Sequence, residues 1–398
     1  MKRLIYISIV LFLVGIICLS FGYLVLSTVG ADIETVDSKV QRLSLVLDSN
    51  DKPNIAYGTT DRGLQFAVRI NREWTIETVS SVGSFPSLAL DPDGNPHISF
   101  ILLDEWILKY AFKEEGSWRI ETIDTHVYGA FLALDSNKRP HVAYEFQYGD
   151  ETTIRHAYRS EEGWVAEVVA TLEGESRSVV CSISFDSEGE PHIVYGDPIS
   201  KVVGYAFKSG GSWNNEIVDN ETLWTLGIGR FVSLALDASN NPHICYHYSL
   251  GLTYAVRTDG AWNIETVDNE NTGIACSLAI DSNGNLHISY YSNDNFLAYA
   301  SKKDGEWTIR TIGSKSPDTL STSLALDSED TPHIVYTYYL SPYDPANTEL
   351  EYFVGSEVSS FMGLPASPIV AYAFFGGGAV TIIVGAVLIL RGRKTRVG

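Results

Sequence analysis

The chain has 398 residues, a formal net charge of −21 at pH 7 and an aromatic content of 12%. An acidic body of this size repels phosphate backbones and so excludes nucleic acid as a partner, and the aromatic content excludes a disordered acidic tail. The cysteines lack the paired spacing of metal sites or disulfide scaffolds, so we interpret Cys181, Cys245 and Cys276 as small buried apolar residues. No metal and no cofactor are predicted.

Residues 1–30 form the first predicted element. Leu4 to Leu26 is almost purely apolar and follows the basic pair Lys2 and Arg3. The segment is either a cleaved signal peptide or an uncleaved signal-anchor helix. Its length exceeds the roughly 7–15 residues usual for the apolar part of a cleaved signal, which favours the anchor.

The next segment, ADIETVDS at 31–38, recurs as IETVSS at 76–81, IETIDT at 120–125 and IETVDN at 264–269. Each later copy follows a Trp and ends a repeated unit. The first copy has no Trp before it and no unit that it could end.

Seven related units follow, typified by SLALDPDGNPHISF at 87–100 and SLALDSEDTPHIVY at 323–336. The sequence pattern within each unit predicts four short strands, here called A to D. Strand A is the SLALD run, strand B follows a polar turn, strand C resembles LKYAFK at 108–113, and strand D begins at a Trp, as in WTIRTI at 307–312. Four strands in units of about 45 residues indicate the blades of a β-propeller.

The seventh unit has strands A (323–327), B (332–336) and C (350–355) but no strand D. IETVD at 33–37 supplies that strand from the other end of the chain and closes the ring without an open edge. The predicted fold is therefore all-β, a seven-bladed β-propeller over residues 31–355 with four-stranded blades.

This closure predicts the orientation of the ring. The two chain ends replace the C–D turn of the seventh blade, so both leave from the face that carries the A–B and C–D turns. The opposite face, formed by the D–A and B–C loops and called the loop face below, varies most in length and composition. We expect a ligand there.

The C-terminal part predicts a linker at 356–368, a transmembrane helix at 369–390 and a basic cytoplasmic tail at 391–398. The expected location is the cell membrane, with the propeller on the extracytoplasmic side and the membrane itself as one partner.

Six histidines occupy one strand-B position, once per blade: His97, His141, His192, His243, His287 and His333. A metal ring is the alternative reading, but a repeated residue tied to its own blade by a hydrogen bond, for example to the strand-A Asp, is favoured. The tryptophans that begin strand D are predicted to pack between blades.

The C–D turn SKKDGEW at 301–307 resembles the Asp box of sialidase-type propellers, and the repeat as a whole resembles propellers of membrane-anchored microbial surface proteins, archaeal ones among them. Sialidase activity would need an arginine triad. Arg42, Arg177 and Arg230 precede inner strands, but at unequal offsets, so no catalytic residue is assigned.

Residues that depart from the repeat on the loop face are the candidate ligand-binding residues, because aromatic rings beside carboxylates suit sugar stacking or a protein anchor. These residues are Trp106, Trp224, His126, His247, Tyr248, Tyr128, Asp104, Glu105, Tyr148 and Asp294. Plugging of the ring by the same aromatic residues is the competing interpretation.

The predicted function is a binding or adhesion module for a glycan or a surface protein. The alternatives are a glycan-active hydrolase or lyase on the same face, and a structural component of a surface layer. An enzyme should show paired carboxylates or a His–carboxylate pair at the mouth of the channel, whereas a binding module should show an aromatic platform without them.

Overall fold

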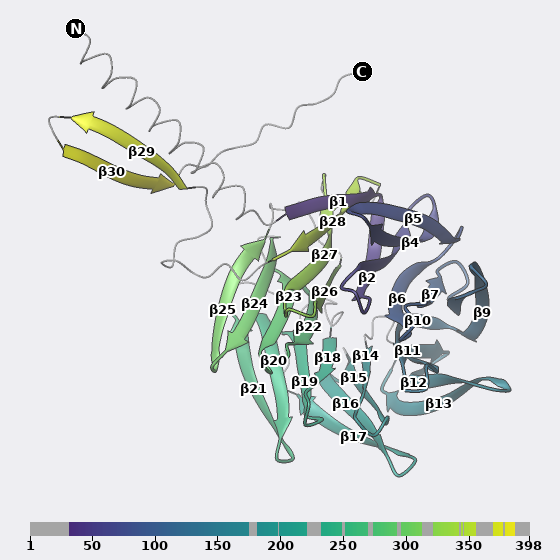
Figure 1. Cartoon of the computed structure of the whole chain (residues 1–398). Helices are drawn as coiled ribbons and strands as arrows, with labels where there is room; N and C mark the ends of the chain where they lie inside the picture. The colour runs from purple at the N-terminus through teal and green to yellow at the C-terminus, as the bar shows by residue number, and fades with distance from the viewer. Residues whose placement is uncertain are drawn as a thin grey trace, which may run out of the picture. The chain divides into compact units, whose positions relative to one another are not determined.

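The computed structural model describes residues 32–174, 181–197, 199–220, 232–248, 251–269, 274–292, 296–312, 321–341, 344, 346–355, 369–376 and 379–386. Residues 33–354 form one compact unit of seven four-stranded sheets, arranged around a central axis, which confirms the predicted propeller (Figure 1). Neighbouring strands within each blade whose register is defined pair antiparallel. The fold is therefore all-β throughout these blades.

The strands of the first four blades, in the order A to D, have the following bounds. They are β2 (Val40–Leu47), β3 (Pro53–Thr59), β4 (Gly63–Ile70) and β5 (Glu73–Ser80); β6 (Ser84–Leu90), β7 (Pro96–Leu102), β8 (Ile107–Glu114) and β9 (Ser117–Thr125); β10 (Val127–Leu134), β11 (Pro140–Tyr148), β12 (Glu151–Ser160) and β13 (Gly163–Leu172); and β14 (Cys181–Phe185), β15 (Pro191–Asp197), β16 (Val202–Ser209) and β17 (Ser212–Asp219).

The remaining blades follow the same order. They are β18 (Val232–Leu236), β19 (Pro242–Tyr248), β20 (Gly251–Thr258) and β21 (Ala261–Asp268); β22 (Ile274–Ile280), β23 (Leu286–Tyr291), β24 (Leu297–Lys303) and β25 (Glu306–Ile312); and β26 (Thr322–Leu326), β27 (Pro332–Tyr339) and β28 (Thr348–Val354), with β1 (Asp32–Ser38).

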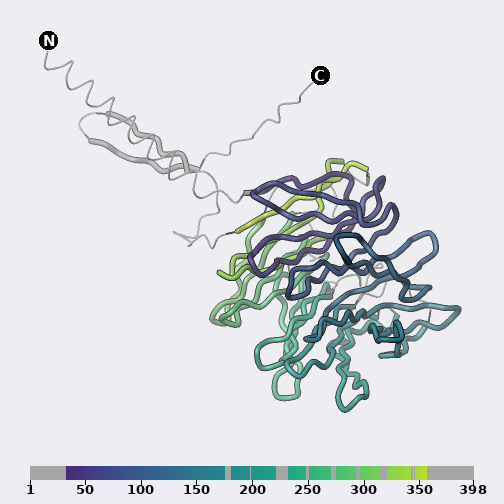
Figure 2. Tube along the Cα trace, turned by 45° about the vertical axis from the view of Figure 1, so that its right-hand side comes forward, coloured from purple at the N-terminus to yellow at the C-terminus, as the bar shows by residue number. Residues whose placement is uncertain are grey.

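The ring closes as the sequence predicts. β1 is the outermost strand of the seventh blade, beside β28. The Lys39 N–H donates to the Thr348 carbonyl over 2.7 Å, and the Thr348 hydroxyl donates to the Val40 carbonyl over 2.8 Å. The first and last strands of the propeller, β1 and β28, therefore run side by side in one blade (Figure 2).

Hydrophobic packing lies between blades rather than within them. Each of the seven interfaces holds one cluster of buried residues drawn from both neighbouring sheets. The interface of blades two and three, for example, joins Ile101 and Leu108 to Val127, Leu132 and Val142. Burial of apolar surface in all seven seams drives the sheets to stack around the ring.

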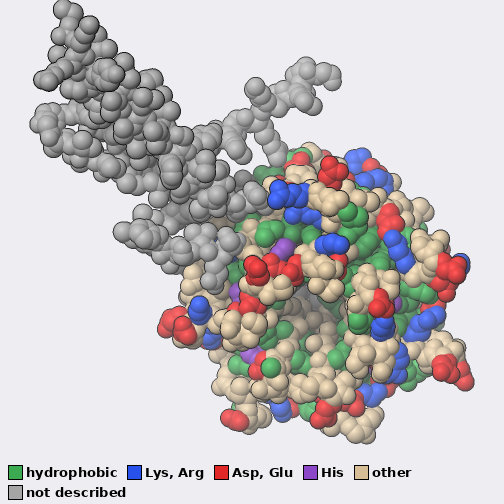
Figure 3. All heavy atoms as spheres, in the orientation of Figure 1, with side chains coloured by type: hydrophobic (Ala, Val, Ile, Leu, Met, Phe, Trp, Pro, Cys, Tyr) green, Lys and Arg blue, Asp and Glu red, His purple; other side chains and the backbone are tan. Residues whose placement is uncertain are grey.

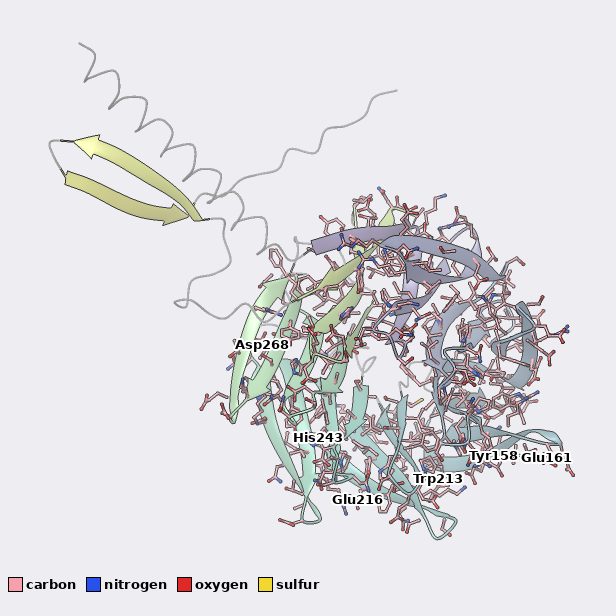
Figure 4. The ribbon with its side chains drawn as sticks, in the orientation of Figure 1. Tyr158, Glu161, Trp213, Glu216, His243 and Asp268 are labelled. Carbon is pink, nitrogen blue, oxygen red and sulfur yellow. The ribbon has the colours of Figure 1, made fainter. Side chains whose placement is uncertain are left out.

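The repeated phrase IETVD makes polar contacts to the next blade. In the copy at 264–268, which ends at the Asp268 labelled in Figure 4, Glu265 of β21 accepts hydrogen bonds from Lys302 and, over 3.0 Å, from Trp307 of the next blade. The Asp of the same copy accepts from a strand-B Tyr: the Tyr290 hydroxyl donates to Asp268 over 2.6 Å. The motif recurs because each copy joins two blades.

The strand-B histidines are tied into their own blades, in agreement with the favoured interpretation. His333 lies 3.2 Å from Asp327 of the preceding turn and 2.5 Å from the Tyr352 hydroxyl of strand C. The same Asp–His–Tyr arrangement recurs at His192, His243 and His287. Among the described residues, no group of three or more His, Cys, Asp or Glu side chains could hold a metal ion.

The predicted transmembrane helix at 369–390 is wrong for the part that the structure describes. β29 (Ile369–Gly376) pairs antiparallel with β30 (Ala379–Ala386). Length and apolarity predicted a helix, but β-branched and aromatic residues on both sides of a Gly-Gly-Gly run favour a hairpin. Within the described parts of the chain, no helix is long and apolar enough to cross a bilayer. The predicted N-terminal helix lies outside the described residues.

Candidate ligand site at the loop face

A cavity of about 470 Å³ lies on the propeller axis, where the inner strands begin at the loop face. This volume falls within the roughly 300–1,000 Å³ typical of small-molecule sites. Figure 3 shows one face of the propeller with a hollow at the centre of the ring. The lining residues used below are Arg42, Ser44, Phe85, Ser87, Trp106, Tyr128, Phe131, Ser182, Ser233, Cys276, Ser277 and Ser323. We call this space the loop-face cavity.

Serine hydroxyls recur around the inner wall, once in each of six blades. The Ser44 hydroxyl accepts a hydrogen bond from the Leu88 N–H of the next blade over 3.1 Å. Five equivalent bonds join Ser87 to Leu132, Ser182 to Leu234, Ser233 to Leu278, Ser277 to Leu324 and Ser323 to Leu45. Each hydroxyl uses a lone pair for the neighbouring blade and keeps its own hydrogen to donate.

Blade three breaks this ring, because Phe131 stands where the other blades have Ser. Its aromatic ring joins Phe85, Trp106 and Tyr128 in the lining of the cavity. Blades one to three thus contribute aromatic rings and Arg42, whereas blades four to seven contribute mainly small hydroxyl-bearing residues. The cavity has an aromatic side and a hydroxyl side.

Four side chains of the aromatic side contact one another in two pairs. The Trp106 and Tyr128 rings have centroids 4.4 Å apart and planes inclined by 35°. The Arg42 guanidinium carbon lies 5.0 Å from the centre of the Phe85 ring, a cation–π distance. All four side chains are partly exposed, so an aromatic surface faces the cavity without being buried by protein.

β-Bulges explain why these side chains reach the cavity. The register of strands A and B shifts between Ser84 and Ser87, between Val127 and Gly129, and between Ile274 and Ser277. Phe85, Tyr128 and Cys276 are residues that the ladder skips. A bulge changes the direction of the side chain of the unpaired residue, and here it turns these three side chains toward the cavity.

The backbone is also in an uncommon conformation at this site. Phe85 has a φ of 54° and Trp106 a φ of 52°, in the left-handed region that bulky residues rarely adopt. Trp106 is held there because its carbonyl accepts from the Val127 N–H over 3.0 Å. Such conformations cost on the order of 1–3 kcal/mol and concentrate at functional sites.

A second aromatic cluster lies on blade three at the same face. His126, with a φ of 61°, contacts Tyr148 edge-on with ring centroids 5.0 Å apart. Tyr148 is 65% exposed. Beside it the Arg155 guanidinium stacks on Phe146 at 3.3 Å and bonds Asp124 at 3.3 Å. These residues do not line the loop-face cavity.

The charge of the cavity decides what chemistry it supports. Among the lining residues that the structure describes, Arg42 is the one charged side chain, and there is no Asp, Glu or His. Acid–base or nucleophilic catalysis on a glycan needs paired carboxylates or a His–carboxylate pair. The described lining offers aromatic rings, hydroxyls and one guanidinium to a ligand.

The predicted site residues have different placements. Trp106 and Tyr128 come together in the cavity, and His126 meets Tyr148 outside it. Asp104 and Glu105 are exposed in the turn before Trp106. His247 is only 6% exposed, and Tyr248 ends β19. Trp224 and Asp294 lie outside the described residues, as do Arg177 and Arg230.

The sequence analysis missed Phe85, Phe131 and the serine wall, and it considered Arg42 only as part of a catalytic triad. One signal was available: SLALD begins with Ser in most units and with Phe in blade three. The bulge at Phe85 has no such signal, because the strand pattern alone does not show which residue the ladder skips.

Comparisons with known proteins support the fold. No family model and no curated protein matches the chain. The structure of an ulvan lyase of polysaccharide lyase family PL25 is similar at a TM-score of 0.57 and 12% identity, over 81% of this chain and 96% of the lyase. The polysaccharide lyase Uly1 is similar at 0.51 and 8% identity, over 78% and 89%.

The six-bladed fucose-recognising lectin of Aleuria aurantia aligns at a TM-score of 0.48 and 13% identity, over 71% of this chain and 99% of the lectin. Identities this low show a shared propeller architecture and no more. These findings do not support the resemblance of the turns to sialidases.

Proposed function

We propose that the protein is a glycan-binding module whose loop-face cavity holds a sugar against Trp106 and Tyr128. One observation carries the proposal: a cavity of about 470 Å³ has an aromatic side and a hydroxyl side, and its described lining residues include no acid–base pair. The polysaccharide lyases named above share the propeller architecture, so glycan ligands are known for this fold. The assignment of a glycan to this protein is supported by its own cavity.

The two sides of the cavity suit the two kinds of surface on a sugar. Its C–H face is apolar and packs on an aromatic ring, as Trp and Tyr anchors do in binding sites generally. Its hydroxyls exchange hydrogen bonds with Ser44, Ser233 and their equivalents, which stay oriented because each is already bonded to the next blade.

The test is a screen of the chain against a panel of oligosaccharides, followed by titration calorimetry with Trp106→Ala and Tyr128→Ala. Each change should weaken binding by about 2 kcal/mol, roughly 30-fold in Kd. Ile120→Ala, at a residue 45% exposed on β9, is the control and should bind normally. Full affinity in the Trp106 and Tyr128 variants would remove the proposed site.

We further propose that the propeller is held outside the cytoplasm by the N-terminal apolar segment. Support comes from the length of Leu4–Leu26 and its basic flank. Protease added to intact cells should degrade the propeller if this is correct, whereas complete protection with recovery in the cytosolic fraction would contradict it.

A further inference from the structure

We infer that the protein binds its glycan as an extended chain rather than as a single sugar, and that His126 and Tyr148 form a second subsite beside the loop-face cavity. This inference rests on the glycan-binding function proposed above. It concerns the length of the ligand: a single sugar would contact the cavity alone, whereas an oligosaccharide reaches the second subsite as well.

The two aromatic clusters lie on either side of one short segment of blade three. Tyr128 contacts Trp106 in the cavity, with ring centroids 4.4 Å apart, and His126 contacts Tyr148, with ring centroids 5.0 Å apart. Only the buried Val127 separates His126 from Tyr128 in the chain. The Cα atoms of residues two apart in extended chain are roughly 6–7 Å from each other, a distance comparable to the length of a sugar unit. Neighbouring sugars of one chain can therefore contact the two clusters.

Main-chain hydrogen bonds connect the clusters. The Val127 N–H donates to the Trp106 carbonyl over 3.0 Å, and the Gln147 N–H donates to the His126 carbonyl over 3.0 Å. The B–C loop of blade two, the segment entering β10 and the end of β11 thus form one continuous row. Trp106 and His126 both have left-handed φ values, 52° and 61°, which bulky residues rarely adopt. Backbone strain of this kind concentrates at binding sites.

Tyr148 has the exposure of a residue that receives a ligand. At 65% it is the most exposed large apolar side chain among the residues that the structure describes. The exposed His126 ring meets it edge-on, with planes at 87°, and the Nδ1 atom of His126 lies 3.0 Å from the Thr125 hydroxyl. Because these contacts already restrain the Tyr148 ring, less side-chain freedom is lost when a sugar packs on it.

The second subsite also has polar groups for sugar hydroxyls. Phe146 packs beside His126, with ring centroids 6.1 Å apart, and the Arg155 guanidinium carbon lies 3.3 Å from the centre of the Phe146 ring. Arg155 bonds Asp124 over 3.3 Å, and both side chains are 22% exposed. A guanidinium donates and a carboxylate accepts, so adjacent hydroxyls of one sugar can bond both. The subsite thus combines rings with polar groups, as the cavity does.

The experiment measures how affinity depends on the length of the sugar chain. Cello-oligosaccharides, chito-oligosaccharides and oligogalacturonates, each from monosaccharide to hexasaccharide, are titrated into the full chain by calorimetry. In at least one series the affinity should rise about 3- to 10-fold once the ligand is long enough to contact Tyr148, and longer members should add little.

Variants assign this rise to the second subsite. Tyr148→Ala should abolish the rise and leave the shortest ligand that binds unaffected, whereas Trp106→Ala should weaken every length by a similar factor. Tyr148→Phe keeps the ring and should keep the rise. Val82→Ala, at a residue 54% exposed in the D–A loop that enters blade two, is the matched control and should bind every length normally. Circular dichroism and the Tm of each variant report folding.

An affinity that does not change with length, or a rise that persists in Tyr148→Ala, would overturn the inference and leave the glycan-binding function standing. A monosaccharide that binds as tightly as the longest member of its series would do the same. If no member of the three series binds, the inference fails, and the oligosaccharide panel described above decides the function independently.

Discussion

The histidine pair of blade three shows how one substitution changes the proton balance of a repeat. In blade seven the Tyr352 hydroxyl and Asp327 satisfy both nitrogens of a neutral His333. In blade three His156 replaces the Tyr, and its ring nitrogens contact His141 and Glu167, each at 2.9 Å. The series Asp135–His141–His156–Glu167 has three contacts, and each needs one N–H to be a hydrogen bond. Two neutral imidazoles supply only two N–H groups, so one contact lacks a proton.

Burial of this histidine pair predicts acid sensitivity. Burial and the neighbouring His156 lower the pKa of His141 to about 4, and Asp135 opposes that shift while Arg139 adds to it. Burial also lowers the pKa of His156; Glu167 opposes this shift, and Lys208 adds to it. An unfolded His titrates near pH 6.5, so the unfolded state binds more protons and stability should fall as pH drops from about 6.5 towards 4.

The variant His156→Tyr restores the arrangement of the other blades. The loss of unfolding free energy between pH 7 and pH 5, measured by urea titration, should shrink by roughly 1–2 kcal/mol because one acid-sensitive His is removed and the shift caused by the pair is relieved. Tyr158→Phe, at a partly buried neighbour, is the control for a ring change in the same strand. An unchanged pH dependence in His156→Tyr would contradict this account.

At the scale of elements, the closing strand β1 makes the same contacts as strands β9, β17 and β21 of blades two, four and five. Glu34 bonds Arg69 and accepts from Trp74 over 3.3 Å, and Asp37 accepts from the Tyr57 hydroxyl over 2.7 Å. Tyr57 is fully buried, and burial together with Asp37 raises its pKa well above the usual range. β1 is therefore an integral strand of the blade rather than a loose end.

Asp37→Ala should accordingly destabilise the fold by about 1–3 kcal/mol, because it leaves a buried hydroxyl without its acceptor. Asp268→Ala makes the same change at Tyr290, in a seam that the chain crosses covalently. Hydrogen exchange is the discriminating measurement: only Asp37→Ala should raise exchange along β1 and β28. Equal exchange in both variants would show that the closing seam has no special weakness.

Most of the element pattern was predictable because each blade repeats it. Strand order, the closing role of 33–37 and the tying of the histidines follow from local contacts that every copy must make. The cavity was less predictable, because Phe85 and Tyr128 reach it only through β-bulges. The position of the Arg42 guanidinium in turn depends on its contact with the Phe85 ring. Residues 369–386 were misread because hydrophobicity alone does not distinguish a helix from an apolar hairpin.

At the scale of the whole molecule, the seams between blades are not equivalent. The seam of blades three and four lacks the serine bond, because Phe131 replaces Ser, and the Trp213 indole N–H has no partner among the described residues. Lys208 and Asn215 still bridge it, to Glu167 (2.6 Å) and to the Val169 carbonyl (3.0 Å). Among the described residues, this seam has fewer side-chain hydrogen bonds than the closing seam between blades seven and one.

Native-state hydrogen exchange should therefore open first at the seam of β13 and β14 rather than at the chain ends. Sub-global opening starts where the fewest contacts break. The readout is amide protection in β14 against that in β1, measured at low denaturant. Earlier loss of protection in β1 than in β14 would contradict the ranking of the seams.

The A–B turns follow an alternation that an odd ring cannot complete. Their left-handed position carries a side chain in blades one, three, five and seven (Asp51, Lys138, Asn240 and Asp330) and Gly in the other three blades. Each of these side chains bonds the preceding blade: Asp51 to Ser328, Lys138 to Asp93, Asn240 to Ser187 and Asp330 to Ser282.

With an even number of blades, every blade would have one such partner. With seven blades, the four contacts can include every blade only if one blade takes part in two of them. That blade is the seventh, which contacts blade one through Asp51 and blade six through Asp330. The doubled connection falls on the one blade assembled from β1 and β26 to β28, where no hairpin joins strands C and D. The odd number of blades thus places two turn contacts on the blade in which strands C and D are joined only by noncovalent bonds.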